Sequence, residues 1–230
     1  MGIASRPIML APNTLFRRDL IVAFIALLLL LAWDASGMDL QLVRHWADTG
    51  GFPWRERWIT ARVLHEGGRA FAWVVAAVLM VNVKWPLWRE QTRRERIWWI
   101  AATFACVIVI PLIKRSSSTS CPWDLAEFGG SAQYVSHWAF GGLDGGPGKC
   151  FPSGHASSAF AFLSGWFALR RAYPRGARLW LAGVIVAGSV FGFVQMIRGA
   201  HYASHTMWTA WVCWMLCTLG ARWLLDGERA

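Results

Sequence analysis

The sequence predicts an all-α, polytopic membrane protein, with a single domain over residues 1–230 that forms a six-transmembrane-helix bundle with outer-face loops and interfacial helices. Of the 230 residues, 56% are hydrophobic and only 16% are charged, which is too little charge to cover the surface of a soluble domain. Apolar runs that approach the length of a bilayer crossing recur along the chain. No internal repeat or change in composition marks a second domain.

The six predicted spans are apolar runs separated by polar or charged segments. They cover about residues 20–33, 70–83, 97–113, 156–169, 179–197 and 206–225. Several are shorter than the ~20 residues that a membrane helix needs, so we expect flanking residues to extend them. The first run also resembles a signal peptide, and we interpret it as a retained helix. Segment 34–69 mixes tryptophans with charged residues, which predicts helices lying in the membrane interface.

Arginine residues predict the orientation of the bundle. They gather before the first span, between spans two and three, between spans four and five, and after span six. These residues are Arg6, Arg17, Arg18, Arg89, Arg93, Arg94, Arg96, Arg170, Arg171, Arg175, Arg178, Arg222 and Arg229. All four segments fall on one side of a six-span arrangement, which the positive-inside rule makes cytoplasmic, with both termini inside.

The remaining segments, 34–69, 114–155 and 198–205, are then predicted to lie on the outer face. The net charge of +10 is divided among the segments between apolar runs, which favours contact with anionic lipid headgroups. No basic stripe or base-reading motif is present, so the sequence predicts no nucleic-acid partner. It makes no prediction of an oligomeric state.

Reactive residues concentrate in two of these outer segments. Lys114 ends the third span, and Ser153, Gly154 and His155 come directly before the fourth. Backbone N–H groups at the start of a helix favour an anion, and the lysine adds positive charge.

The connection between spans five and six carries Arg198, His201 and His205. An arginine grips phosphate with two parallel hydrogen bonds. With an anion held there, two histidines suffice for phosphoryl transfer, because one attacks phosphorus and the other protonates the leaving oxygen. Cationic and N–H groups stabilise the developing charge, so this chemistry requires no metal or cofactor.

These residues resemble the motifs of the type-2 phosphatidic acid phosphatase superfamily, in its membrane lipid phosphatase branch. The family pattern is a Lys followed after six residues by Arg-Pro, then Pro-Ser-Gly-His, then Ser-Arg with a His six residues after the Arg and an Asp four further on. Here Lys114 is followed after six residues by Cys121-Pro122, the second motif is Pro152-Ser153-Gly154-His155, and Gly199-Ala200-His201 matches the core of the third. The matching motifs lie within residues 114–205.

The resemblance implies a role for each matching residue. His201 would be the nucleophile that forms a phosphohistidine, and His155 the general acid that later activates water. Lys114, Ser153 and the Gly154 N–H would hold the phosphate oxygens.

The chain departs from the family pattern at three positions. Cys121 replaces the Arg of the first motif. Gln195 replaces the Arg of the third, and we expect Arg198, about one helical turn later, to bind phosphate instead. His205 replaces the Asp that orients the nucleophile, and a neutral imidazole can also accept the His201 N–H. The outer-loop carboxylates that we consider as substitutes are Asp124, Glu127 and Asp144.

Cys121 and Cys150 border two of these motifs in the predicted outer loop. An oxidising periplasm permits a disulfide between them, which would tether the first motif to the second. The alternative is two unpaired thiols. Cys106, Cys213 and Cys217 lie within apolar runs and are interpreted as packing residues.

The function predicted from the sequence is removal of phosphate from a lipid on the periplasmic face of a bacterial inner membrane. Compatible substrates are undecaprenyl diphosphate, a lipid A phosphate, phosphatidate and phosphatidylglycerol phosphate. One alternative is a phosphotransferase that passes the phosphoryl group to a second lipid. Others are a non-catalytic protein that binds anionic lipid, and a metal-dependent hydrolase. The ligands of that metal would come from His137, His155, His201, His205 and Asp124. We interpret His45, His65 and His137 as structural.

Overall fold

A computed structural model describes residues 12–139 and 141–226 of the chain, so that Arg6, Arg229 and both termini, which entered the orientation argument, lie outside the described residues. The described residues form helices and loops without a β-strand. The α-helices are α1 (Pro12–Ser36), α2 (Met38–Arg44), α3 (Gly68–Lys84), α4 (Arg93–Arg115), α5 (Ser157–Phe160), α6 (Ser164–Leu169), α7 (Pro174–Ile197) and α8 (Ala203–Asp226). A π-helix, η1 (Ile59–Gly67), precedes α3, and three short 3₁₀ turns are η2 (Pro122–Asp124), η3 (Ala126–Phe128) and η4 (Ala161–Leu163).

Helices occur at all six apolar runs that the sequence predicts as spans. Within the described residues, three helices are long and apolar enough to cross a membrane: Ile59–Lys84, Arg93–Arg115 and Pro174–Ile197. A fourth crossing is formed if Asn13–Ala35 and Met38–Arg44, which meet at a 66° bend, count as one span. The helix over Ser157–Leu169 is apolar but shorter. The protein is therefore a helical membrane protein, and the count of six spans stays a prediction.

The second spanning helix begins well before the predicted residue 70. The structure joins η1 and α3 into one helix from Ile59 to Lys84. Segment 34–69 is predicted to lie in the membrane interface. Its last eleven residues form the first turns of this helix, and their position relative to the membrane stays a prediction. The apolar pattern ends at charged residues, and two of these form an ion pair within the helix, where Arg62 donates to Glu66 at 2.8 Å. This extension brings His65 and Arg69 into the bundle.

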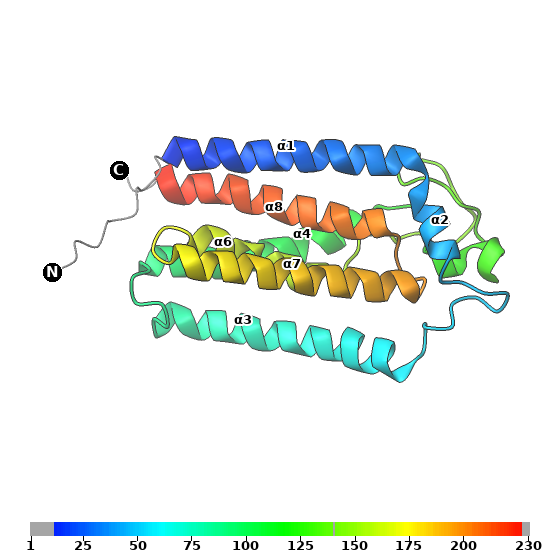
Figure 1. The fold of residues 1–230 in the computed structure, drawn as a ribbon, viewed down its shortest axis with the longest axis horizontal. Coiled ribbons are helices and arrows are strands. Elements are labelled where there is room, and N and C mark those ends of the chain that lie inside the picture. The colour runs from blue at the N-terminus through cyan, green and yellow to red at the C-terminus, as the bar shows by residue number, and fades with distance from the viewer. Residues whose placement is uncertain (1–11, 140, 227–230) are drawn as a thin grey trace.

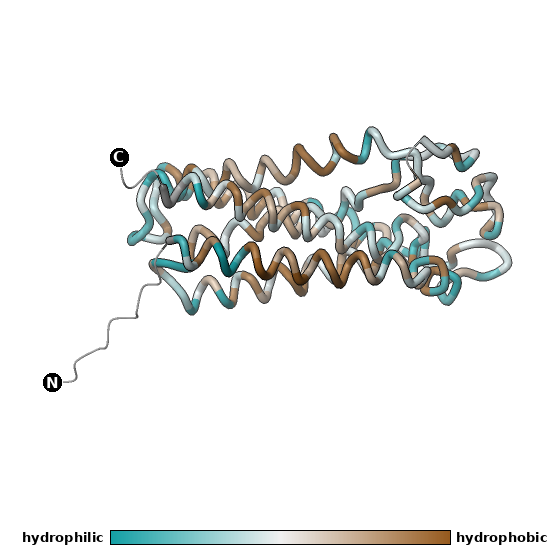
Figure 2. Tube along the Cα trace, turned by 90° about the horizontal axis from the view of Figure 1, so that it is seen from above, coloured by the Kyte–Doolittle hydropathy of each residue, from teal (hydrophilic) through white to brown (hydrophobic). Residues whose placement is uncertain are grey.

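The long helices run side by side along one axis, with their connections gathered at two ends (Figure 1). The α3–α4 and α6–α7 connections lie at one end, and α2, the loop after α4 and the α7–α8 turn lie at the other. The hydrophobic residues concentrate along the middle of the bundle and hydrophilic residues at both ends (Figure 2). The three predicted outer segments therefore share one end of the molecule, here called the loop end.

Aromatic residues fill the core between α4, α6, α7 and α8. Trp99 is fully buried, and its ring meets those of Trp88 and Trp180 at centroid distances of 5.0 and 5.1 Å. Gly188 of α7 leaves room for Phe160, whose ring would lie 2.4 Å from an added Cβ. This packing holds the helix of the second motif firmly against α7.

Two buried carboxylates fasten the loop end. Asp39 of α2 accepts hydrogen bonds from Trp33 Nε1 at 2.8 Å, from Ser204 N at 3.0 Å and from the Ser204 hydroxyl. Asp34 accepts from the indole N–H groups of Trp138 and Trp208 at 2.9 and 3.0 Å. Because Ser204 is in the first turn of α8, these contacts fix the place where α8 begins and therefore the histidines beside it.

Candidate active site

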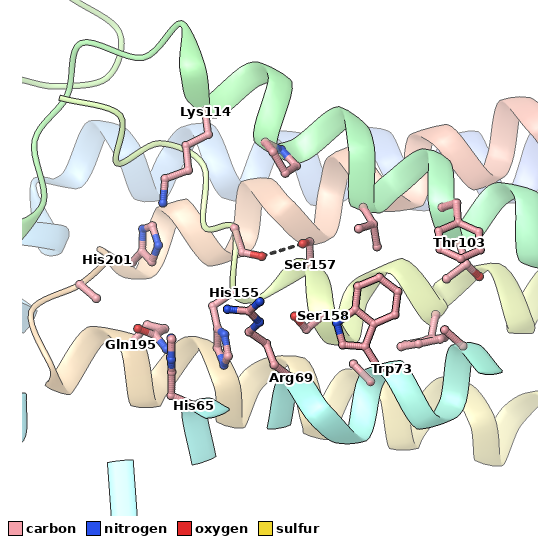
Figure 3. A pocket seen from close by; sticks show the side chains of 18 of the residues that line it. His65, Arg69, Trp73, Thr103, Lys114, His155, Ser157, Ser158, Gln195 and His201 are labelled. Atoms are coloured by element: carbon pink, nitrogen blue, oxygen red, sulfur yellow. Dashed lines mark hydrogen bonds between the residues drawn. The ribbon is translucent and has the colours of Figure 1, made fainter. Parts of the chain in front are cut away.

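A cavity of about 470 Å³ opens at the loop end between α3, α4 and the second motif. Its polar lining residues include His65, Arg69, Lys114, His155, Gln195 and His201, several of which Figure 3 shows pointing toward one another. Further into the bundle the lining is mainly apolar and includes Trp73, Ala76, Phe104, Val107, Pro111 and Phe162. The cavity thus has a cationic end near the loops and an apolar end between the helices.

The turn between α7 and α8 presents His201 to the cavity. Gly199 adopts a φ of 72°, and an added Cβ there would lie 2.3 Å from the ring of Phe52, so a side chain is excluded on both counts. The carbonyl of Gln195 then accepts the backbone N–H groups of Ala200 at 2.8 Å and His201 at 3.3 Å. The reversal of the chain is therefore closed by backbone hydrogen bonds and leaves His201 buried, with 4% of its surface exposed.

His201 is electrically neutral in this environment. Burial first, and then the positive charge of Lys114, lower the pKa of His201 well below its usual value, while a hydrogen bond to the backbone of Cys150 acts in the opposite direction. A neutral imidazole keeps a lone pair, which a nucleophile requires.

His155 lies at the start of the helix that follows the second motif. Its ring stacks on that of His65 with a centroid distance of 4.3 Å and an interplanar angle of 13°. Burial, then the neighbouring His65 and Arg198, lower the pKa of His155 to about 4. Its Nε2 is buried and has no hydrogen-bond partner within the described part of the chain. A phosphate dianion in the cavity would raise this pKa and supply the missing partner.

Lys114 extends from the last turn of α4 toward His201 (Figure 3). Its Nζ lies 3.9 Å from the position that a Cβ of Gly154 would occupy, so the ammonium group sits above the second motif. The Gly154 carbonyl accepts the Ser157 hydroxyl at 2.6 Å, which fixes the motif against its helix. Lysine, glycine and both histidines thus surround one space, large enough for a phosphate group.

Ser153 does not line the cavity, although the family resemblance assigns it to phosphate binding. Its N–H donates to the His205 carbonyl at 3.1 Å, and its own carbonyl accepts the Thr209 hydroxyl at 2.9 Å. The side chain is fully buried. In this structure Ser153 attaches the second motif to α8, and a role as phosphate ligand stays a prediction.

Gln195, and not Arg198, reaches the cavity from the third motif. The Arg198 guanidinium instead donates to the Arg55 carbonyl at 2.9 Å and contacts the Gln195 amide oxygen at 3.5 Å. Arg198 follows the end of α7 and lies outside the cavity lining, and its role as a phosphate ligand stays a prediction. The Gln195 Nε2 is buried without a hydrogen-bond partner among the described residues and is a candidate donor to phosphate.

His205 lies beside His201 without a hydrogen bond to it. The two imidazole centroids are 5.7 Å apart, and both ring nitrogens of His205 are buried without a hydrogen-bond partner among residues 12–139 and 141–226.

The three carboxylates considered as substitutes bind elsewhere. Asp124 accepts the Cys121 N–H at 3.2 Å, Glu127 pairs with Arg44 at 2.5 Å, and Asp144 accepts the Ser120 N–H at 2.6 Å. The geometry therefore gives His201 no carboxylate from any of these three residues.

Cys121 and Cys150 form a disulfide, with their Cα atoms 5.1 Å apart. Cys121 lines the cavity, and the Sγ of Cys150 lies 3.5 Å from His201 Nδ1. These two sulfurs and His201 also form a group with metal-ligand spacing, but disulfide sulfurs are not the thiolates that such a site needs. The metal site considered above would instead need Asp124 and His137, whose carboxylate and ring bind Cys121 and Asp34.

His65 and Arg69 are the cavity residues that sequence reasoning missed. Both precede the predicted second span, and His65 was interpreted as structural. The two residues are four positions apart, so they lie on one face if the helix begins before His65. This spacing is the sequence pattern that could have identified them. His137 does have a structural environment, because its ring stacks on Phe151 at 4.3 Å.

Together, the fold and the cavity define a class: helical membrane proteins in which two histidines and a lysine converge on an amphipathic pocket. The family model of the PAP2 superfamily matches residues 96–229, more than half of the chain, and the protein belongs to this superfamily. This match confirms the resemblance drawn from the three motifs.

One similar solved structure is the crystal structure of the first transmembrane PAP2 type phosphatidylglycerolphosphate phosphatase from Bacillus subtilis. It superposes with a TM-score of 0.52 at 15% sequence identity, and the match covers 96% of each chain. The two proteins share a fold over the matched residues. Among curated proteins, the search found no match.

Proposed function

We propose that this protein is an integral membrane lipid phosphatase that hydrolyses a phosphomonoester or diphosphate of a lipid through a phosphohistidine at His201. The observation that carries the proposal is the convergence of His201, His155 and Lys114 on one cavity. Membership of the PAP2 superfamily supports phosphate-ester chemistry at these residues.

The reaction follows from the positions of the two imidazoles. The neutral His201 attacks phosphorus, and the bond to the leaving oxygen breaks as His155 gives that oxygen a proton. The lipid alcohol, or lipid monophosphate, departs. His155, now neutral, takes a proton from water, which attacks the phosphohistidine and releases inorganic phosphate. Lys114 and the Gln195 amide stabilise the charge on the phosphate oxygens throughout.

The shape of the cavity supports a lipid rather than a soluble phosphate ester. The cationic end adjoins an apolar region lined by α3 and α4, so an amphiphile would place its phosphate at the histidines and its tails between the helices. Candidates are undecaprenyl diphosphate, a lipid A phosphate, phosphatidate and phosphatidylglycerol phosphate. The arginine-rich connections at the opposite end favour a site that faces the periplasm of a bacterial inner membrane.

Phosphate release by the purified protein in detergent, measured across these four lipids, tests the proposal. We expect release that vanadate inhibits and that a chelator leaves unchanged, and His201→Ala should abolish it while the protein still elutes as a folded species. Labelled phosphate found on a second lipid would identify a phosphotransferase instead. Loss of activity on chelation would support a metal enzyme, and full activity in His201→Ala would overturn the proposed mechanism.

A further inference from the structure

The position next to the nucleophile lacks the carboxylate that the third motif normally carries there. In a histidine nucleophile, a hydrogen bond at one ring nitrogen decides which nitrogen carries the proton and which attacks. His205 does not make this bond, since both of its nitrogens are without a partner in the described part of the chain. His205 therefore does not fix the imidazole of His201, and the contacts at this ring come from Cys150.

The group that faces His201 Nδ1 is the sulfur of Cys150, at 3.5 Å. The same sulfur lies 3.2 Å from the Ala200 carbonyl, so it is in contact with the turn that presents the nucleophile. Cys150 is fully buried, and its backbone N–H donates to the Thr119 carbonyl at 2.9 Å. Backbone hydrogen bonding with Cys150 is also the one influence that raises the pKa of His201. Cys150 thus contacts the nucleophile through both its sulfur and its backbone.

The disulfide fixes the chemical character of this sulfur. A disulfide sulfur has lone pairs and no proton, so in a hydrogen bond with Nδ1 it only accepts, and Nδ1 then carries the hydrogen. Nδ1 is then the N–H, and the lone pair is on Nε2. A free thiol at the same place could donate its S–H to Nδ1, which would favour the opposite tautomer and leave Nε2 protonated and unable to attack.

The bond to Cys121 also holds the sulfur in place. Cys121 N donates to Asp124, and Trp123, two residues after Cys121, donates its backbone N–H to the Gly199 carbonyl at 2.9 Å. The disulfide therefore joins the first motif loop, the entry to the second motif and the turn of the third.

We propose that the Cys121–Cys150 disulfide is the positioning group of the nucleophile, with the Cys150 sulfur accepting the Nδ1 hydrogen of His201 in place of the missing carboxylate. This inference rests on the proposed function. It states that the disulfide determines which ring nitrogen of His201 carries the proton. Because the sulfur carries no charge, it orients the ring without stabilising an imidazolium as a carboxylate would.

Removing both sulfurs in Cys121→Ala/Cys150→Ala tests the proposal. We expect kcat to fall at least about tenfold, with KM changed less than about twofold, because the tautomer is lost while the phosphate ligands stay. Adding His205→Asp to this variant should restore kcat at least about fivefold, because a carboxylate then takes the Nδ1 hydrogen. Cys217→Ala, which removes a buried thiol of α8 outside the cavity lining, is the matched control and should leave kcat unchanged.

Each other outcome decides against the inference. Unchanged kcat in the double variant would show that the sulfur is dispensable, and a loss that His205→Asp does not restore would reduce the disulfide to a structural cross-link. If the double variant does not fold, dithiothreitol treatment provides the second comparison. Reduction should then inactivate the wild-type protein but not His205→Asp, and equal sensitivity would overturn the inference. An oxidised wild-type protein inactive on every lipid would reject the proposed function itself.

Discussion

The neutral state of buried His155 predicts a loss of stability in acid that one substitution should reduce. Its pKa is lowered from 6.5 to about 4 in the folded protein, mainly by burial, so between these values the unfolded chain binds a proton that the folded protein excludes. Stability is therefore complete above the unfolded pKa and falls as the pH decreases toward the folded value. Two-state linkage gives a loss of about 2.5 kcal/mol from this one group between about pH 7.5 and about pH 4.5.

Unfolding in detergent, followed by tryptophan fluorescence at both pH values, measures this loss. Other groups titrate in the same range, so the informative quantity is the difference between the wild-type protein and His155→Gln. We expect the variant to lose about 2 to 3 kcal/mol less than the wild-type protein on acidification. Equal losses in the two proteins would refute the account, because they would show that His155 is protonated as readily in the folded protein as in the unfolded chain.

Three further substitutions test the site and its support. His65→Phe keeps a ring stacked on His155 but removes the imidazole that lowers the pKa of His155. The basic limb of the kcat/KM profile should therefore move to higher pH. An unshifted limb would show that His65 has no electrostatic influence on His155. Lys114→Met removes the ammonium group over the phosphate position and should lower kcat/KM about 10- to 100-fold in phosphate-release assays, whereas a change below about twofold would exclude phosphate contact. Asp39→Asn disrupts the hydrogen bonds that the Asp39 carboxylate accepts at the start of α8, and it should lower the free energy of unfolding by about 2 kcal/mol. The exposed control Asp48→Asn should lower it by less than about 1 kcal/mol. Equal losses in the two variants would contradict the anchoring role of Asp39.

The order of apolar runs and motifs in the sequence was sufficient to predict the site residues that belong to the three motifs. Lys114, His155 and His201 each end or precede an apolar run, so alternation of the helices alone was expected to bring them to one end of the bundle. The structure shows all three in one cavity. The same reasoning found helices at the six apolar runs, although the number that cross the membrane stays a prediction.

Residues whose position depends on where a helix starts or stops were not predictable from the pattern. His65 and Arg69 reach the cavity because the continuous helix of η1 and α3 begins at Ile59, where an internal Arg62–Glu66 pair makes the charged turn compatible with a helix. Arg198, which follows the end of α7, lies outside the cavity lining. Helix ends are set by tertiary contacts and capping as much as by composition, which is why hydropathy placed them poorly.

The measurement that tests the central claim most directly is identification of the phosphorylated residue during turnover. The protein would be mixed with a ³²P-labelled lipid phosphate, quenched in base to preserve phosphohistidine, digested and analysed by mass spectrometry. We predict label on His201. Turnover without any label on His201, or label on another residue in the active wild-type protein, would contradict the account.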